Sequence, residues 1–373
     1  MMANVLSLVP YKIFPARFGG QKMIALFNNY FSVYHQLTCV TVKANEPTGQ
    51  PYELLNILSN NKFRYINPMY FFKMRKIIQQ KRITHLIIEH PYYGWLGLLL
   101  QRFCGIKLIV KSHNIESLRF RSIGKWWWKI LWRYEGFIHR HATLSFCITE
   151  EDRDYIIEVY HVLRDRTMLV TYGVESDIPP STEIRSLARE TLLEKHSINA
   201  NETIFLFNGS LGYPPNLEAV RNILFHILPI ICKSGLQFKI LICGGGLPEE
   251  MGAFKEYKNV IYAGFVEDIA LYFNGSDVFL NPLTTGGGIK TKLVEALASD
   301  LNAVSTTSGA VGVNAGICNH KLLISADQDW EDFTKKMQEA AILMNTIPNS
   351  FFDHFYWKLI VKRAADALPP YLF

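Results

Sequence analysis

The feature that most constrains the fold is a regular alternation of short apolar runs with longer amphipathic segments along the chain. The runs are rich in Leu and β-branched residues and contain few polar positions, which is typical of parallel strands covered on both faces. The expected strands are 4–9, 37–43, 85–89, 107–111, 143–147, 167–171, 203–208, 238–243, 260–263, 278–280 and 303–305. The pattern therefore predicts an α/β fold.

Helical patterns fill the intervals between these runs. They are expected at 20–34, 67–80, 123–140 and 215–231. The alternation stops at 173–180, where two prolines follow the last strand of the first half. Ser181 is then expected to cap a polar helix that ends at His196, before a new series of strands begins at Thr203.

This break predicts two doubly wound, Rossmann-like domains that face each other across a cleft, with boundaries at 1–178 and 179–349. A final helix within 350–373 comes after a complete second series, so it is expected to pack back on the first domain. Ligands of open parallel sheets bind beyond the carboxyl ends of the strands, so the cleft is the expected binding site.

Composition excludes several classes of protein. Hydrophobic residues make up 49% of the 373 residues and charged residues 19%, so the chain can build packed cores and is not disordered. The six cysteines form no CxxC pair and lie in or beside apolar runs, which is typical of buried thiols in a reducing compartment. No apolar stretch approaches the ~20 residues of a spanning helix, and the amino terminus has no signal-peptide pattern. A cytoplasmic protein is expected.

The net charge of +6 is concentrated in one segment, between Lys111 and His141. A nucleic-acid-binding protein would carry its positive charge more widely, so no nucleic-acid partner is expected.

The segment 281–298, NPLTTGGGIKTKLVEALA, carries the strongest chemical signal. Three glycines before a helix let backbone N–H groups approach an anion, and the helix amino terminus adds unpaired donors and partial positive charge. Lys290 and Lys292 fall in the first turn, where a cation opposes the helix dipole unless an anion such as a diphosphate is bound. Glu295 shares a face with Lys292 and can accept hydrogen bonds from ribose hydroxyls. The alternative interpretation is a surface helix with an ordinary Lys–Glu pair.

Two common nucleotide motifs are excluded by spacing. No glycine precedes a Lys–Ser/Thr pair in the Walker A frame, and Glu249 occupies the third glycine position of a dinucleotide fingerprint after KILICGGG. Neither an ATPase nor an NAD enzyme is supported.

Several segments together resemble one known family. They are NGSLGYPPNLEAV (208–220), KILICGGG (239–246) and 259–298 in the second half, and ARFGGQK (16–22), SHNIESLRF (112–120) and FCITEEDRD (146–154) in the first. In this order and spacing the chain resembles the retaining glycosyltransferases of the GT-B fold, specifically family 4. The resemblance implies an acceptor-side first domain and a second domain that binds a nucleotide-sugar donor.

The resemblance also implies roles for individual residues. His113, which follows the strand 107–111, matches the histidine beside the donor sugar, and Lys292 and Glu295 complete the expected catalytic set. The expected donor-binding residues are Gly19, Gly20, Gly209, Ser210, Gly264, Phe265, Val266, Gly287, Gly288, Ile289 and Lys290.

Two departures from the family pattern bear on the chemistry. Gly287 stands where many members have the first carboxylate of a Glu-x7-Glu pair, and no Arg/Lys pair follows Gly209, so Lys290 or Lys292 is expected to carry the phosphate charge. The acidic triplets 152–154 and 327–329 are interpreted as helix starts rather than a metal site. Metal-independent transfer without a cofactor is expected.

The segment 121–141 contains a tryptophan-rich helix. Its spacing places Ile123, Trp126, Trp127, Ile130, Leu131, Tyr134, Phe137 and Ile138 on one face, which predicts a core-facing stripe. The indoles of Trp128 and Trp132 fall outside that stripe, beside Lys125, Lys129 and Arg133. Two interpretations remain open: this second face rests on an anionic membrane beside a lipid-linked acceptor, or another element covers both indoles.

The sequence thus predicts a retaining glycosyltransferase that moves a sugar from a nucleoside-diphosphate sugar to a glycan or lipid-linked acceptor in surface polysaccharide synthesis. It would be cytoplasmic, and peripheral contact with the inner face of the membrane is expected only under the first interpretation of the tryptophan-rich helix. Two alternatives stay open: a nucleotide-sugar epimerase of similar fold, and a non-catalytic nucleotide-sugar-binding subunit.

Overall fold

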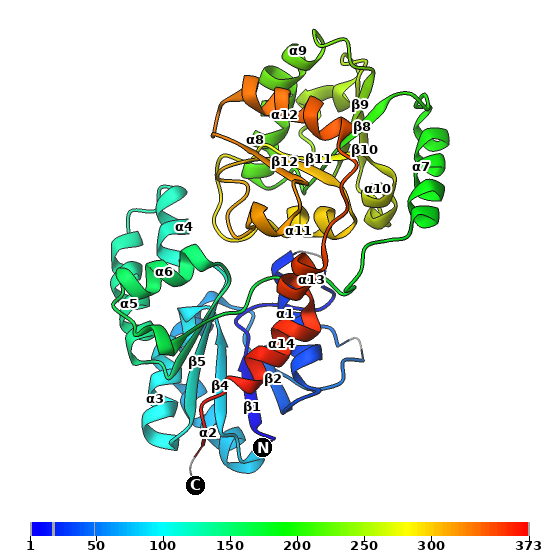
Figure 1. The fold of residues 1–373 in the computed structure, drawn as a ribbon. Coiled ribbons are helices and arrows are strands. Elements are labelled where there is room, and N and C mark those ends of the chain that lie inside the picture. Colours follow the sequence, from blue (N-terminus) through cyan, green and yellow to red (C-terminus); the bar gives the residue numbers. More distant parts are fainter. Residues whose placement is uncertain (1, 17–18, 48, 372–373) are drawn as a thin grey trace. The chain divides into compact units, whose positions relative to one another are not determined.

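A computed structural model describes the chain apart from residues 1, 17–18, 48 and 372–373. The chain forms two compact units (Figure 1). Unit 1 comprises Met1–Gly173 and Trp357–Phe373, and unit 2 comprises Val174–Tyr356. The last segment of the chain therefore returns to the unit in which the chain begins.

Unit 1 is built on a seven-stranded parallel sheet with the strand order β3-β2-β1-β4-β5-β6-β7. The strands are β1 (Asn4–Leu8), β2 (Gln36–Val42), β3 (Glu53–Leu58), β4 (His85–Glu89), β5 (Lys107–Ser112), β6 (Leu144–Cys147) and β7 (Thr167–Leu169). The helices are α1 (Gly19–Phe31), α2 (Met69–Lys81), α3 (Gly94–Cys104), α4 (Glu116–Ser122), α5 (Trp128–His141), α6 (Glu150–Glu158) and α14 (Trp357–Asp366), with short 3-10 turns at Lys62–Ile66, Pro91–Tyr93 and Arg164–Arg166.

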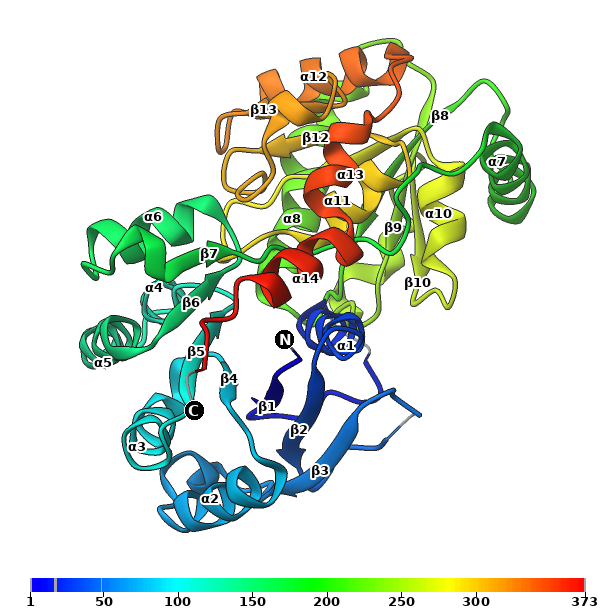
Figure 2. The ribbon, with the colours of Figure 1, turned by 60° about the horizontal axis from the view of Figure 1, so that its bottom comes forward.

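The sheet of unit 1 is covered on both faces. On one face Met74 of α2, Leu96 of α3 and Ile138 of α5 join the core formed with strand residues such as Leu86 and Leu108. On the other face α1 and α14 lie side by side (Figure 2). Cover on both faces accounts for the nearly continuous apolar strands.

Unit 2 contains a six-stranded parallel sheet with the order β10-β9-β8-β11-β12-β13. The strands are β8 (Thr203–Asn208), β9 (Phe238–Cys243), β10 (Val260–Gly264), β11 (Val278–Asn281), β12 (Asn302–Thr306) and β13 (Leu322–Ser325). The helices are α7 (Thr182–His196), α8 (Pro214–Asn222), α9 (Leu228–Ile231), α10 (Ile269–Gly275), α11 (Thr291–Ala298), α12 (Trp330–Ile342) and α13 (Asn349–Phe355), with a π-turn at Ile223–Ile227 and 3-10 turns at Glu249–Phe254 and Ala315–Ile317.

The α/β prediction is confirmed, and the expected strands are present with small shifts of their ends. Sequence analysis missed β3 and β13, which lie at the edges of their sheets. Both strands are short and only partly buried. In β3 the run ELLNIL is interrupted by Asn56, whereas the run LLI of β13 was present in the sequence and was overlooked.

The final helix differs from the expected single element. Two helices, α13 and α14, meet at Tyr356, whose backbone is extended (φ −83°, ψ 124°). The Val174 N–H donates to the carbonyl of Phe355, and Val174 pairs with Tyr356 as an isolated bridge. This pairing requires extended backbone at Tyr356 and so interrupts the helix.

The tryptophan-rich segment also differs from its prediction. The helix expected at 123–140 is α5, which begins only at Trp128, and residues 123–127 connect it to the preceding helix α4. Half of the stripe expected to face the core is exposed instead: Trp126 is 82% exposed and Ile130 65%, and Ile123 and Phe137 are exposed too. Ile138, by contrast, is buried in the core as expected. Trp128 and Trp132, expected at the surface, are half-buried.

The difference between the expected and the observed buried face of α5 has a physical cause. The buried residues of α5 are Glu135, Gly136, Ile138 and His139. Gly136 lets the Tyr160 ring approach the helix, because a Cβ at this position would lie 2.8 Å from that ring. The Glu135 carboxylate is buried because it accepts hydrogen bonds from the N–H groups of Glu116 and Ser117 at the start of α4. A satisfied carboxylate can occupy the inner face, a possibility that a count of apolar residues ignores.

Within the described residues, no helix combines the length and the apolar character needed to cross a membrane.

Candidate active site

Unit 1 gathers titratable groups where two neighbouring strands end. Glu89 ends β4 and is followed by His90, and Ser112 ends β5 and is followed by His113. Because β4 and β5 pair in parallel, their carboxyl ends lie at the same edge of the sheet. The two imidazole rings lie 4.3 Å apart between centroids.

The Glu89 carboxylate contacts one of these histidines, His113. This carboxylate lies 2.6 Å from Nε2 of His113 and 3.1 Å from Nζ of Lys111, and the Glu89 and Lys111 side chains are almost completely buried. Burial alone would raise the pKa of Glu89, but the charge of Lys111 and the hydrogen bond of His113 lower it to about 2. Burial and the neighbouring His90 lower the pKa of His113 to about 4. His113 is therefore a neutral imidazole at pH 7 and donates its Nε2 proton to an ionised carboxylate.

Glu116 holds the other histidine. Its Oε1 lies 3.0 Å from Nδ1 of His90, and its Oε2 accepts hydrogen bonds from the Tyr92 hydroxyl (2.5 Å) and the Arg119 guanidinium (2.6 Å). Burial would raise the pKa of Glu116, but the hydrogen bond with His90 and the charge of Arg119 hold it well below the usual range. Nε2 of His90 lies 3.0 Å from the Tyr11 hydroxyl. Each histidine thus has its own buried carboxylate.

A pocket of about 800 Å³ opens above these groups. Two predicted site residues, Gly20 and His113, both line it. Its walls are mainly aromatic and come from the loop after β1, the 3-10 turns 62–66 and 91–93, α3, α4, the residue before α5, and α5 itself: Tyr11, Tyr65, Tyr92, Trp95, Phe120, Trp127 and Tyr134. The arrangement suits a flat ligand that has both apolar and hydrogen-bonding surfaces.

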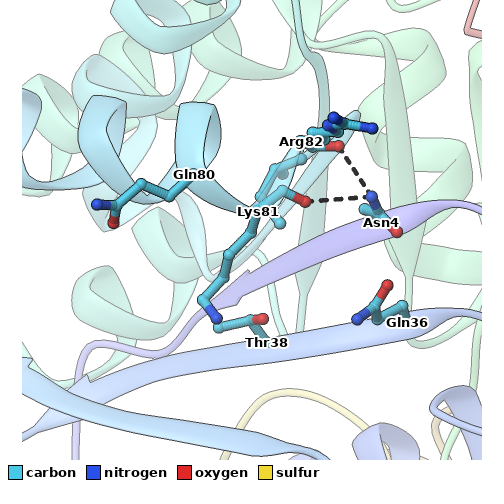
Figure 3. A pocket seen from close by; sticks show the side chains of 7 residues that line it. Asn4, Gln36, Thr38, Gln80, Lys81 and Arg82 are labelled. Carbon is cyan, nitrogen blue, oxygen red and sulfur yellow. Dashed lines mark hydrogen bonds between the residues drawn. The ribbon is translucent and has the colours of Figure 1, made fainter.

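A second, smaller pocket of about 420 Å³ lies where β1 and β2 begin. Figure 3 shows the Asn4 side-chain amide donating to the carbonyls of Lys81 and Arg82 at the end of α2. The Lys81 ammonium pairs with Glu53. This pocket lies at the amino ends of the strands and has no buried titratable group, so we do not assign it a catalytic role.

In unit 2 the predicted donor residues follow the carboxyl ends of β8, β10 and β11. The loop after β8 and the end of β10 are both hydrogen-bonded to the turn after β9. The Gly244 N–H donates to the carbonyl of Gly264, and the Leu211 N–H donates to that of Gly245. A Cβ at Gly244 would lie 1.9 Å from the carbonyl oxygen of Gly209. Only glycine permits this approach of two backbones.

The glycine-rich turn before α11 is held from two sides. Lys290 donates from Nζ to the carbonyls of Gly286 and Gly288, both at 2.9 Å. On the other side, the Glu218 carboxylate on α8 accepts hydrogen bonds from the hydroxyls of Thr284 and Thr285. The turn is thus preorganised, and Gly286 and Gly288 adopt the positive φ that favours glycine.

Lys292 and Glu295 lie in the first turns of α11, which begins at Thr291, so Lys290 precedes the helix and does not lie in its first turn as expected. Their side chains form an ion pair at 2.8 Å and are partly exposed. Ile289 is buried and Gly287 is exposed. Phe265, after β10, is 80% exposed, whereas Gly264 and Val266 are half-buried.

The predicted sites are therefore distributed over both units. Gly19, Gly20 and His113 belong to unit 1, with Gly19 at the start of α1 and Gly20 in the pocket, whereas Lys292, Glu295 and the other donor residues belong to unit 2. Arg17 and Phe18 of the ARFGGQK segment lie outside the described residues. Within the described residues, no three His, Cys, Asp or Glu side chains are grouped to hold a metal ion.

Sequence analysis did not single out Glu89 or His90. A signal was present in the strand pattern: His90 directly follows the strand 85–89, and His113 lies two residues after the strand 107–111. Adjacent parallel strands bring such residues together, but adjacency was not read from the sequence.

The five residues predicted for membrane or acceptor contact separate into two groups. Lys125, Lys129 and Arg133 are exposed. The indole N–H of Trp132 donates to the Tyr155 hydroxyl, and the Arg121 guanidinium lies 5.0 Å from the Trp128 ring. Neighbouring side chains thus contact both indoles, which favours the second of the two interpretations left open for this face.

Two family models match the chain, one in each unit. A model described as "Glycosyltransferase Family 4" matches residues 33–178, and one described as "Glycosyl transferases group 1" matches residues 202–341. Together they account for more than half of the chain. The chain belongs to the GT-B glycosyltransferases. The resemblance to family 4 seen in the sequence is thereby confirmed.

Solved structures share the fold of this glycosyltransferase. Sucrose-phosphate synthase from Thermosynechococcus elongatus superposes with a TM-score of 0.73 at 14% identity, over 97% of this chain and 98% of that one. Alr3699/HepE from Anabaena, in complex with UDP, superposes with a TM-score of 0.73 at 15% identity, over 97% and 99%. At these identities the likeness shows the fold alone.

One curated relative is more similar in sequence. An uncharacterized 44.6 kDa protein in the cps region of Klebsiella pneumoniae is 30% identical to this glycosyltransferase over 133 residues. The match covers 33% of this chain and 34% of that protein, so it spans about a third of the relative's length.

Proposed function

We propose that this glycosyltransferase moves a sugar from a nucleoside-diphosphate sugar to a glycan or lipid-linked acceptor, with retention of anomeric configuration and without a metal ion. The observation that carries the proposal is the glycine-rich turn 286–288 before the amino terminus of α11, fixed by hydrogen bonds to Lys290 within it and to Glu218 just before it. Such a terminus binds phosphate through backbone N–H groups. The solved Anabaena protein of the same fold holds UDP.

In this proposal the backbone of Gly287, Gly288 and Ile289 binds the diphosphate. Lys292, whose ammonium is partly exposed beside the turn, neutralises the charge that grows on the leaving phosphate. Glu295 accepts hydrogen bonds from the ribose hydroxyls. Lys290 supports the turn through its two carbonyl contacts, so its contribution is mainly to the shape of the site.

The transition state of such a transfer has oxocarbenium character, and the chemistry demands stabilisation of the departing diphosphate. Preorganised N–H donors and Lys292 provide this without a metal. His113, held neutral by burial and oriented by Glu89, offers an uncharged imidazole to a sugar hydroxyl. It contributes hydrogen bonding and no charge at pH 7.

The direct test incubates the full chain with a panel of UDP-, GDP- and dTDP-sugars, with and without EDTA, and follows products by NMR. Hydrolysis or transfer that retains the anomeric configuration and survives EDTA supports the proposal. Epimerised donor would indicate the nucleotide-sugar epimerase, and binding without turnover would indicate a non-catalytic subunit.

Lys292→Ala is expected to lower kcat about 100- to 1,000-fold, the usual effect of removing one transition-state donor. Lys255→Ala is the matched control, because Lys255 is an exposed lysine of unit 2 outside the turn. Equal activity of the two variants would contradict the role of Lys292.

The membrane part of the proposal is modified by the structure. Trp126, Ile130 and Ile123 now form the exposed apolar surface beside Lys125 and Lys129. Exposed aromatic and aliphatic side chains next to cations suit an anionic lipid surface. We therefore place the protein at the cytoplasmic face of a membrane during surface polysaccharide synthesis. Flotation with anionic vesicles tests this, and recovery of the protein only in the vesicle-free fraction would contradict it.

A further inference from the structure

We propose that the aromatic pocket of unit 1 binds an uncharged sugar ring of the acceptor and discriminates against acidic sugars and sugar phosphates. The inference rests on the proposed function and specifies the acceptor that this function takes. Three features of the pocket carry it: the walls, the polar floor and the cancellation of charge.

The walls present flat apolar faces with polar edges. Trp127 packs on Phe120, with 4.5 Å between ring centroids, and Tyr65 packs on Tyr92 at 5.7 Å. These contacts fix the orientation of the rings before a ligand arrives. An aromatic face suits the C–H face of a pyranose, and the pocket volume of about 800 Å³ holds one or two such rings.

The floor offers hydrogen-bonding groups, one of which is the neutral imidazole of His113. Nε2 of His113 is directed to Glu89, which leaves Nδ1 as the acceptor position of a neutral imidazole that lines the pocket. His90 and the Asn114 side chain lie beside it in the lining. A sugar hydroxyl both donates and accepts, so it can bond to such a mixed set of groups.

The charges in and below the pocket cancel in pairs. The only Lys, Arg, Asp or Glu side chains that line it among the described residues are Glu116 and Arg119, which are joined at 2.6 Å. Below the lining, Lys111 is joined to Glu89. A carboxylate or phosphate on the ligand would lose its hydration without meeting an uncompensated cation, which is costly in a pocket of low polarity. A neutral ring incurs no such cost.

The experiment measures binding of methyl glucoside, methyl galactoside and methyl mannoside to the full chain by saturation-transfer NMR and calorimetry. Methyl glucuronide and glucose 6-phosphate are the charged counterparts. We expect at least one neutral glycoside to bind at least tenfold more tightly than either charged probe. Equal or tighter binding of a charged probe, or no binding of any neutral glycoside, would overturn the inference.

Two neighbouring tryptophans provide a matched pair of variants. Trp127 lines the pocket, whereas Trp126 is exposed and does not. Trp127→Ala is expected to weaken neutral glycoside binding at least tenfold, and Trp126→Ala to leave it within twofold. Equal effects of the two substitutions would show that the glycoside binds elsewhere.

A change of charge tests the pairing directly. Glu116→Gln leaves the Arg119 guanidinium without its carboxylate, so the folded variant should bind methyl glucuronide at least tenfold more tightly than wild type does. A folded variant without that gain would overturn the charge argument, and if the variant does not fold, the wild-type panel decides. A parallel titration with UDP tests the donor site of unit 2. If the wild-type chain does not bind UDP, the proposed function is contradicted. If it binds UDP but no neutral glycoside, only this inference is contradicted.

Discussion

The two units differ in the groups that they present at the carboxyl ends of their parallel strands. In unit 1 the edge is built from side chains: two histidines, each held by a buried carboxylate, below a ring of aromatic residues. In unit 2 it is built from backbone: glycines at close approach and a turn whose carbonyls are held by Lys290. Side chains can offer a neutral, shaped surface, whereas bare backbone N–H groups suit an anion. Two similar parallel sheets therefore present different chemical groups at the carboxyl ends of their strands.

The largest effect is expected from a substitution at Gly244, which would disrupt the close backbone contact in unit 2. A Cβ there would lie 1.9 Å from a carbonyl oxygen, and the φ of +144° is itself unfavourable for other residues. Gly244→Ala should lower the free energy of unfolding of unit 2 by more than about 4 kcal/mol, or abolish UDP binding in any protein that folds.

Gly235→Ala separates the collision from backbone strain. Its φ is also positive, at +78°, but a Cβ there meets nothing within 4 Å. A loss of about 1 kcal/mol is expected from strain alone. Chemical denaturation measures both variants, and similar losses would show that close backbone approach is not what builds this edge.

In unit 1 the matching test is the ion pair of Glu89 and Lys111. Glu89→Gln leaves the Lys111 ammonium buried without its charged partner, so the free energy of unfolding should fall by about 3–5 kcal/mol. Adding Lys111→Met removes the unpaired charge and should restore most of the loss. A double-mutant cycle by denaturation checks this, and additive losses would contradict coupling of the two groups.

Acid should weaken unit 1 through its neutral histidines. Burial lowers the pKa of His113 to about 4 and that of His139 to about 3, below the ordinary 6.5. The unfolded chain binds these protons first as the pH falls, so stability is lost between pH 6.5 and 4, by about 3 kcal/mol for His113. His139→Gln should flatten the measured pH dependence of unfolding, whereas the exposed His161→Gln should not. Stability that rises on acidification would contradict the account.

The smallest expected effect concerns the exposed surface of α5 and the segment before it. Lys125→Ala should weaken partitioning onto anionic vesicles about fivefold, because one cation near such a surface contributes about 1 kcal/mol. Lys255→Ala in unit 2 is the control. Co-sedimentation measures both, and equal binding to neutral and anionic vesicles would remove the electrostatic argument.

The difference between the units also explains what the sequence could predict. The glycine-rich turn is visible because its chemistry is local, with Gly286 to Gly288 and Lys292 within one short segment. The network in unit 1 is not local, since Glu89 and His113 meet only when β4 pairs with β5. The exposure of Trp126 was predicted wrongly for a related reason. The inner face of α5 is taken by Glu135, whose partners are the N–H groups of α4, and periodicity carries no information about such partners.

Hydrogen–deuterium exchange of the full chain, read by mass spectrometry with and without UDP, tests the central claim most directly. If backbone binds the diphosphate, UDP should slow exchange in peptides that cover 284–292 and 209–213 and leave those covering 89–95 and 112–119 unchanged. Slower exchange in the two unit 1 segments, with none at 284–292, would contradict the assignment of the donor to the glycine-rich turn.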